Sequence, residues 1–158
     1  MSNQKEAINA TAERELTITR IINAPREIVF KAWTDPVQLA NWWGPKGFSS
    51  TIHEADARPG GKIYIEMKAP DGTIYPMDGE FCEINPPERL VFISAALDKD
   101  NKRLFEILNT VTFADVNGKT KLTLHVRVSK IRSEDAHYLD GMNQGWNGSL
   151  DRLTQFVQ

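Results

Sequence analysis

Alternation of apolar and polar residues between tight-turn signals is the feature that most constrains the fold of this chain. It recurs in five stretches, residues 48–58, 62–69, 75–84, 105–113 and 121–128, and residues 89–96 form a continuous apolar run that predicts a sixth strand. A period of two predicts β-strands with one buried face. Turn signals separate several of them, above all Asp71-Gly72 and Asn117-Gly118, and strands joined by tight turns pair antiparallel. The sequence therefore predicts one antiparallel sheet.

Other elements flank this series of strands. Residues 16–22 alternate in the same way and predict a first strand. Pro25 and Glu27 open a short helix, whose predicted apolar stripe consists of Ile28, Val29, Ala32 and Trp33.

The last part of the chain changes to a helical period. Ser133 is a good N-cap for a long helix that we expect to end near Val157. Its predicted apolar stripe is Leu139, Met142, Trp146, Leu150, Leu153 and Val157. Gly141, Gly145 and Gly148 interrupt it, each at a cost of up to ~1 kcal/mol against alanine, so we expect a close approach or a kink there.

This order of elements predicts an α+β fold, in which a curved antiparallel sheet of about seven strands wraps around the long C-terminal helix. A gap between the sheet and the helix would form a cavity. The chain has 158 residues, of which 41% are hydrophobic. We expect a flexible tail at residues 1–13 and a single domain at residues 14–158.

Charge and cysteine content limit the partners. The net charge is −2, without the basic stripe typical of a nucleic-acid or anionic-membrane partner. No apolar run is long enough to cross a membrane, and Cys82 is the only cysteine. We therefore expect a cytoplasmic protein that neither binds nucleic acid nor contains an integral membrane segment. A homodimer is possible.

The stretch W-T-D-P-V-Q-L-A-N-W-W-G-P gathers three of the four tryptophans at residues 33–45. Asp35 is a good N-cap with Pro36 at the first helical position, and Gly44-Pro45 ends the helix. The adjacent rings of Trp42 and Trp43 point about 100° apart on a helix. We expect Trp42 to anchor the helix to the sheet and Trp43 to face the mouth of the cavity.

This tryptophan block resembles the Aha-type branch of the START and Bet v-like (SRPBCC) superfamily, the bacterial homologues of the activator of heat-shock protein 90 ATPase. Three further segments carry the resemblance: A-P-R-E-I-V-F-K-A-W, P-P-E-R-L-V-F and G-W-N-G-S-L-D-R-L. The resemblance covers roughly residues 15–158. The resemblance implies the helix-grip fold, whose members bind lipids, sterols, polyketides or other hydrophobic molecules between the sheet and the C-terminal helix.

We expect a small hydrophobic ligand in that cavity. The candidate apolar contacts are Trp43, Met67, Met77, Phe81, Phe92, Val111, Met142 and Trp146, which provide adaptable thioethers and flat rings. Asn109 shares a face with apolar neighbours and needs a hydrogen-bond partner, either a ligand or a backbone group at a bulge. The alternative is that these side chains fill a core.

No residue pattern predicts catalysis, a metal or a cofactor. His53, His125 and His137 are scattered and favour surface positions, and Cys82 lacks an activating base. If the faces of the strand at residues 62–69 are inverted, Tyr64 and Glu66 become polar groups of the cavity and Glu66 an acid or base. An enzyme of the cyclase, aromatase or hydrolase type and a co-chaperone-like interaction module are therefore the alternatives to ligand binding.

Overall fold

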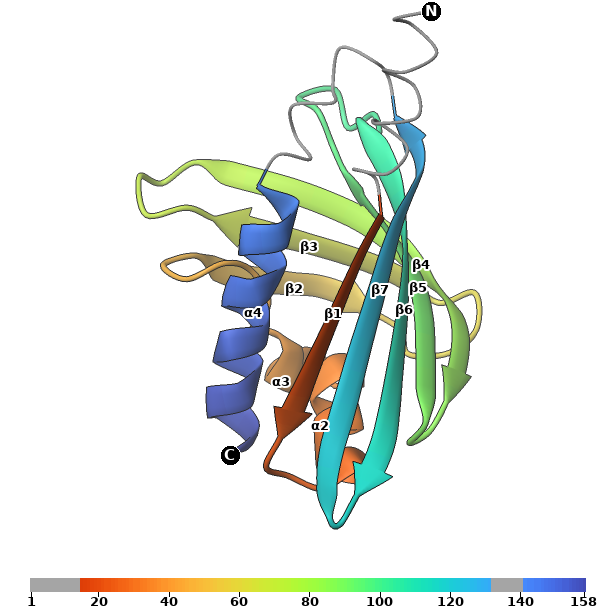
Figure 1. Ribbon diagram of the computed structural model, residues 1–158. Coiled ribbons are helices and arrows are strands. Elements are labelled where there is room, and N and C mark those ends of the chain that lie inside the picture. Colours follow the sequence, from red (N-terminus) through yellow and green to blue (C-terminus); the bar gives the residue numbers. More distant parts are fainter. Residues whose placement is uncertain (1–14, 132–140) are drawn as a thin grey trace, which may run out of the picture.

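The computed structural model describes residues 15–131 and 141–158, which form a curved antiparallel sheet packed against helices (Figure 1). The elements are, in chain order, β1 (Glu15–Ile22), α2 (Arg26–Thr34), α3 (Pro36–Leu39), β2 (Ser49–Ala55), β3 (Lys62–Lys68), β4 (Ile74–Asn85), β5 (Arg89–Ala96), β6 (Phe105–Val116), β7 (Lys119–Ile131) and α4 (Met142–Val157). The predicted fold class is confirmed.

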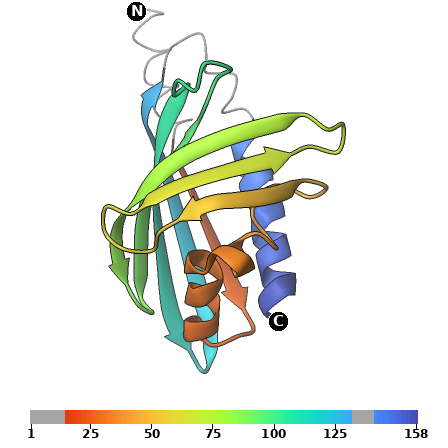
Figure 2. The ribbon, with the colours of Figure 1, turned by 180° about the vertical axis from the view of Figure 1, so that it is seen from behind.

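The seven strands are ordered β1-β7-β6-β5-β4-β3-β2, and every neighbouring pair is antiparallel. Strands β2 to β7 therefore follow one another as a meander, and β1 joins it at the far edge beside β7. The sheet is strongly twisted, α4 lies along its inner side, and α2 and α3 lie beside each other at one end (Figures 1 and 2).

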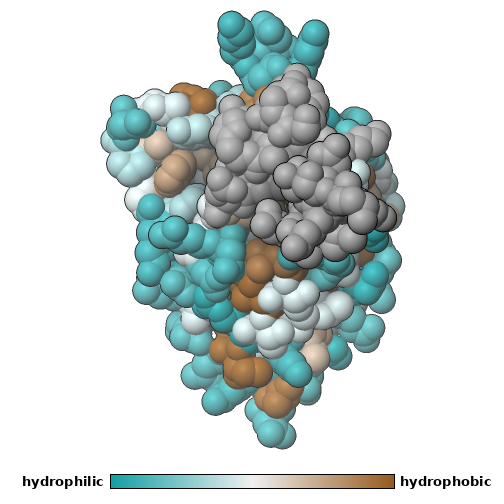
Figure 3. All heavy atoms as spheres, turned by 45° about the horizontal axis from the view of Figure 1, so that its top comes forward, coloured by the Kyte–Doolittle hydropathy of each residue, from teal (hydrophilic) through white to brown (hydrophobic). Residues whose placement is uncertain are grey.

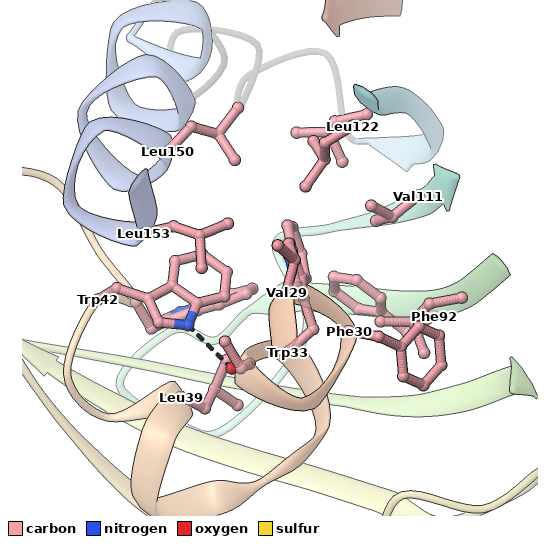
Figure 4. Close-up of a cluster of buried hydrophobic side chains, with 14 of the residues drawn as sticks. Val29, Phe30, Trp33, Leu39, Trp42, Phe92, Val111, Leu122, Leu150 and Leu153 are labelled. Carbon is pink, nitrogen blue, oxygen red and sulfur yellow. Dashed lines mark hydrogen bonds between the residues drawn. The ribbon is translucent and has the colours of Figure 1, made fainter. Parts of the chain in front are cut away.

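The core lies between the inner face of the sheet and the three helices. Figure 4 shows Leu150 and Leu153 of α4 pointing towards the aromatic side chains of α2 and the sheet. On the inner face of β7, the apolar side chains of Leu122, Leu124 and Val126 are completely buried. This strand therefore supports the middle of the core.

The apolar stripe of α2 differs from the prediction at one position. Ile28 is 49% exposed, and Phe30 is buried instead, with its ring 5.1 Å from that of Phe113. At 100° per residue, both positions lie about 100° from the centre of the stripe of Val29, Ala32 and Trp33, so helical geometry alone does not separate them. The packing of Phe30 against Phe113 distinguishes the two positions.

The tryptophan block forms a single capped turn and a tight exit. The Asp35 carboxylate accepts a hydrogen bond from the Val37 amide at 2.9 Å, with Pro36 at the first helical position. The Trp43 amide donates to the Leu39 carbonyl at 3.0 Å, and Gly44 then takes a φ of +99°. The predicted cap and glycine stop are confirmed, although regular helix covers only Pro36–Leu39.

Helix α4 is described from Met142, so the predicted cap Ser133 and stripe residue Leu139 lie outside the described residues. One of its glycines has a clear packing reason. A Cβ added at Gly148 would lie 3.4 Å from the Lys46 amide nitrogen and 3.6 Å from Pro45 Cα. The loop after the tryptophan block therefore packs closely against the glycine face of α4.

Candidate ligand cavity

A cavity of about 330 Å³ lies between α4 and the end of the sheet. Three parts of the chain build its walls. The turn Trp43–Pro45 forms one wall, strands β3 to β6 form the second, and the α4 residues Met142, Trp146 and Ser149 form the third.

Five of the predicted ligand contacts line this cavity: Trp43, Met67, Met77, Met142 and Trp146. Phe81 and Phe92 lie deeper, around a void of only about 10 Å³. Val111 is completely buried on β6. These three side chains pack in the core of the described structure. For them, the alternative interpretation holds, in which the apolar side chains fill a core instead of contacting a ligand.

Several lining residues were not among the predicted ligand contacts, including Ser94, Ser149, Pro45 and Phe105. Two of these residues have a sequence spacing from a predicted contact that places them on the same face. Ser94 follows Phe92 at strand period two, and Ser149 follows Trp146 at helical spacing i+3. Face assignment alone could therefore have found both serines, whereas the contribution of the Gly44-Pro45 turn depends on tertiary packing.

The adjacent rings of Trp42 and Trp43 point in different directions, as expected, but the hydrogen bond of Trp42 is to α2 and not to the sheet, where we expected its anchor. Trp42 is completely buried, and its indole Nε1 donates to the Ala32 carbonyl of α2 at 2.9 Å (Figure 4). Trp43 lines the cavity, with its ring 5.5 Å from that of Trp146 in an edge-to-face arrangement. One ring thus joins two helices, and the other forms a wall of the cavity.

A single guanidinium ties α4 to this turn. Arg152 Nη1 donates to the carbonyls of Gly44 at 2.9 Å, Pro45 at 3.2 Å and Trp43 at 3.3 Å. Its Nη2 donates to the Asn41 carbonyl at 3.2 Å. Burial lowers the pKa of Arg152, but the group stays charged at neutral pH. The position of the Trp43–Pro45 wall is therefore coupled to that of α4.

The polar groups at the cavity are few. Ser94 and Ser149 line it, and Asn109 lies completely buried behind Ser94. Asn109 Nδ2 donates to Ser94 Oγ at 3.0 Å and to the Phe92 carbonyl at 3.3 Å. The described lining residues include no carboxylate, imidazole, amine or thiol.

A second hollow of about 450 Å³ borders the first, and both share Pro45, Gly141 and Gly145. Its wall is polar, with Lys46, Gln144, Asn147 and Asp151. Hydrogen bonds from Arg20 and then Lys46 hold the pKa of Asp151 below its usual range. The glycine face of α4 thus separates an apolar hollow from a charged one.

The inverted-face interpretation of β3 is wrong. Ile63 and Ile65 are buried, whereas Tyr64 and Glu66 lie on the outer face of the sheet. Glu66 Oε1 contacts His53 Nε2 at 2.5 Å, and the rings of His53 and Tyr64 are 5.3 Å apart. Glu66 therefore does not reach the cavity, because two apolar side chains occupy the inner positions of β3.

The remaining candidates for chemistry stay outside the cavity. His125 pairs with Glu15 on the outer face at 2.8 Å, and His137 lies outside the described residues. Within residues 15–131 and 141–158, no group of three or more His, Cys, Asp or Glu side chains could hold a metal. Burial, with a smaller contribution from Glu80, raises the pKa of Cys82, which keeps the thiol protonated at neutral pH.

The surface of the described residues carries no large apolar area on the face shown in Figure 3, where apolar patches are small and separated by polar ones. The exposed large apolar side chains belong to several elements, including Ile21 on β1, Val37 on α3 and Phe156 on α4, and two of them, Ile74 and Tyr75, are neighbours on β4. No described helix is long and apolar enough to cross a membrane.

Comparison with known proteins identifies relatives along almost the whole chain. The model of a family described as activator of Hsp90 ATPase homolog 1-like protein matches residues 23–158. A search of curated proteins finds no match.

Several solved structures share the fold. A protein from Chromobacterium violaceum is 28% identical, with a TM-score of 0.80 over 91% of this chain and 97% of that one. One from Mycobacterium smegmatis is 27% identical, with a TM-score of 0.80 over 94% of this chain and 93% of that one. The AHSA1 protein from Silicibacter pomeroyi is 23% identical, with a TM-score of 0.76 over 89% and 95% of the two chains, and shows the fold alone.

Proposed function

Because this chain belongs to the family of activator of Hsp90 ATPase homolog 1-like proteins, as its tryptophan block predicted, we propose that it binds one small, uncharged, mostly apolar molecule in the cavity between the sheet and α4. The observation that carries this proposal is the cavity itself. Its volume of about 330 Å³ lies at the lower end of the range of small-molecule sites.

The chemistry of the wall supports binding of an uncharged molecule. Aromatic rings of Trp43 and Trp146 and the thioethers of Met67, Met77 and Met142 provide flat and adaptable contacts. A charged group in this cavity would lose its hydration without gaining a partner among the described lining residues. We therefore expect a neutral ligand.

Two observations favour binding over the alternative functions. General acid–base chemistry needs a titratable group near the substrate, and the described lining offers only the Tyr75 phenol. A chaperone-contact surface would favour one contiguous exposed apolar patch, and the large exposed apolar side chains of the described surface are distributed over several elements, with only Ile74 and Tyr75 adjacent in sequence.

A substitution that fills the cavity tests the proposal. Ala96 lines the cavity on β5, so Ala96→Phe would place a ring in the ligand space. We expect the affinity for N-phenyl-1-naphthylamine, a neutral probe that fluoresces in apolar surroundings, to fall at least tenfold. A tenfold loss corresponds to about 1.4 kcal/mol.

The matched control is Ala114→Phe, which adds the same ring at an exposed position of β6. It should bind the probe as the unchanged protein does, and thermal melting should show that both variants are folded. Absence of probe binding by the unchanged protein, or equal binding by both variants, would refute the proposal.

A further inference from the structure

The interior of this protein holds a short chain of polar groups that neither the fold nor apolar packing requires. Asn109 lies on the inner face of β6, opposite Phe92 of β5, and is completely buried. Ser94, two residues after Phe92, lies between this amide and the cavity and lines its wall. The chain of groups therefore leads from the core to the ligand space.

The direction of the hydrogen bond between these two residues follows from a neighbouring carbonyl. The Phe92 carbonyl lies 3.3 Å from Asn109 Nδ2 and can only accept, which identifies this atom as the donating NH₂ group of the amide. Ser94 Oγ, 3.0 Å from the same nitrogen, is then the acceptor in its bond with Asn109.

The hydrogen of the Ser94 hydroxyl is consequently left for another partner. A hydroxyl has one hydrogen to donate, and Ser94 makes no further side-chain hydrogen bond within the described part of the chain. Ser149 on α4 is in a similar situation: it is 5% exposed, lines the cavity and has no side-chain hydrogen bond to any described residue.

We infer that the ligand carries an uncharged hydrogen-bond acceptor, a carbonyl or ether oxygen, to which the Ser94 hydroxyl donates. This inference rests on the proposed function. Asn109 is the positioning residue, because its amide donates to one of the two lone pairs of the Ser94 hydroxyl and leaves the hydroxyl hydrogen to the cavity. Ser149 offers a second donor from α4. The apolar rings and thioethers then hold the remainder of the ligand.

The amide oxygen of Asn109 supports a role other than stability. Asn109 Oδ1 is buried and has no hydrogen-bond partner in the described structure. A buried acceptor without a partner is destabilising, so an apolar side chain of similar size would serve the core at least as well. A residue kept for packing alone would not need this amide.

A pair of fluorescent probes that differ only in the acceptor tests the inference. The ketone 6-propionyl-2-(dimethylamino)naphthalene emits at longer wavelength when its carbonyl accepts a hydrogen bond, and 6-propyl-2-(dimethylamino)naphthalene lacks that oxygen. We expect the unchanged protein to bind the ketone about fivefold more tightly or better, as one net hydrogen bond allows.

In Ser94→Ala this preference should disappear, and the emission of the bound ketone should move to shorter wavelength. The affinity for the propyl probe should not change. Asn109→Leu should reduce the preference for the ketone without lowering the melting temperature, an outcome that a purely structural amide would not give. Ser49→Ala, at an exposed position outside the cavity, is the matched control.

The outcomes separate the two proposals. Equal affinity for both probes, or a ketone preference that persists in Ser94→Ala, would overturn the inference while ligand binding stands. Equal losses for both probes in Ser94→Ala would also overturn it, since they would indicate packing instead of a hydrogen bond. Failure of the unchanged protein to bind either of these probes or N-phenyl-1-naphthylamine would remove the proposed function itself.

Discussion

The two neighbouring tryptophans Trp42 and Trp43 have different roles although they are chemically identical. Trp42 has no exposed surface and a hydrogen bond to α2, whereas Trp43 borders open space. Adjacent positions on a helical turn thus separate an anchor from a wall of the binding cavity.

Replacing each ring by the smaller phenylalanine should reveal this difference. Trp42→Phe loses the indole bond to the Ala32 carbonyl and leaves a void, so we expect the free energy of unfolding to fall by about 2 kcal/mol. Trp43→Phe should cost less stability, because part of its surroundings is already open, and should alter probe affinity. Urea unfolding of both variants checks this, and equal losses would contradict it.

At the scale of elements, α4 is held to the rest of the molecule by polar contacts at its outer face and by apolar contacts beneath. Arg20 of β1 donates to Asp151 Oδ1 at 2.7 Å, and Lys46 Nζ lies 3.2 Å from Asp151 Oδ2. These bonds join the first strand, the loop after the tryptophan block and the last helix.

The Asp151 contacts should make stability depend on pH in one direction. Because the pKa of Asp151 is lowered in the folded protein, its contribution is present above the usual carboxyl range and is lost as pH falls below about 4. We expect Asp151→Asn to lose less than about 1 kcal/mol at pH 7, since the pair is partly exposed.

Unfolding of both proteins in urea between pH 7 and pH 2 tests this expectation. The difference between Asp151→Asn and the unchanged protein should shrink as the pH falls and should be smaller at high salt. A difference that stays constant down to pH 2 would show that the carboxylate charge is unimportant for the contact.

The glycines of α4 should respond differently to alanine. A Cβ at Gly145 would meet only Pro45 Cγ at 3.8 Å, so Gly145→Ala should stabilise the protein by about 0.5–1 kcal/mol through helix propensity. A Cβ at Gly148 would lie 3.4 Å from the Lys46 amide nitrogen, and crowding there should offset the gain. Thermal melting should rank Gly145→Ala above Gly148→Ala, and the reverse order would contradict this account.

For the whole molecule, local patterns predicted the architecture well, since strand period, hairpin turns and caps are properties of short segments. The resemblance carried by the tryptophan block predicted the family, and helical geometry predicted that the rings of Trp42 and Trp43 point in different directions. The extent of the cavity was harder to predict, because it depends on how far α4 stands from the sheet. Phe81 and Phe92 follow the same alternation as Met77 and Ser94, and only the tertiary arrangement places the former in the core and the latter at the cavity.

The position of β1 at the edge of the sheet beside β7 has a consequence for biosynthesis. Glu15 and His125, which meet across these two strands, are 110 positions apart in the chain. At about 5–20 residues per second on the ribosome, β1 waits for roughly 5–20 seconds before its partner is made. The hairpins from β2 to β6 can form during that time, whereas the apolar side chains of Ile18 and Ile22 have no neighbouring strand to pair beside. The first strand to be synthesised is thus among the last to be paired, and the nascent chain must carry it unpaired until nearly the whole sheet has been translated.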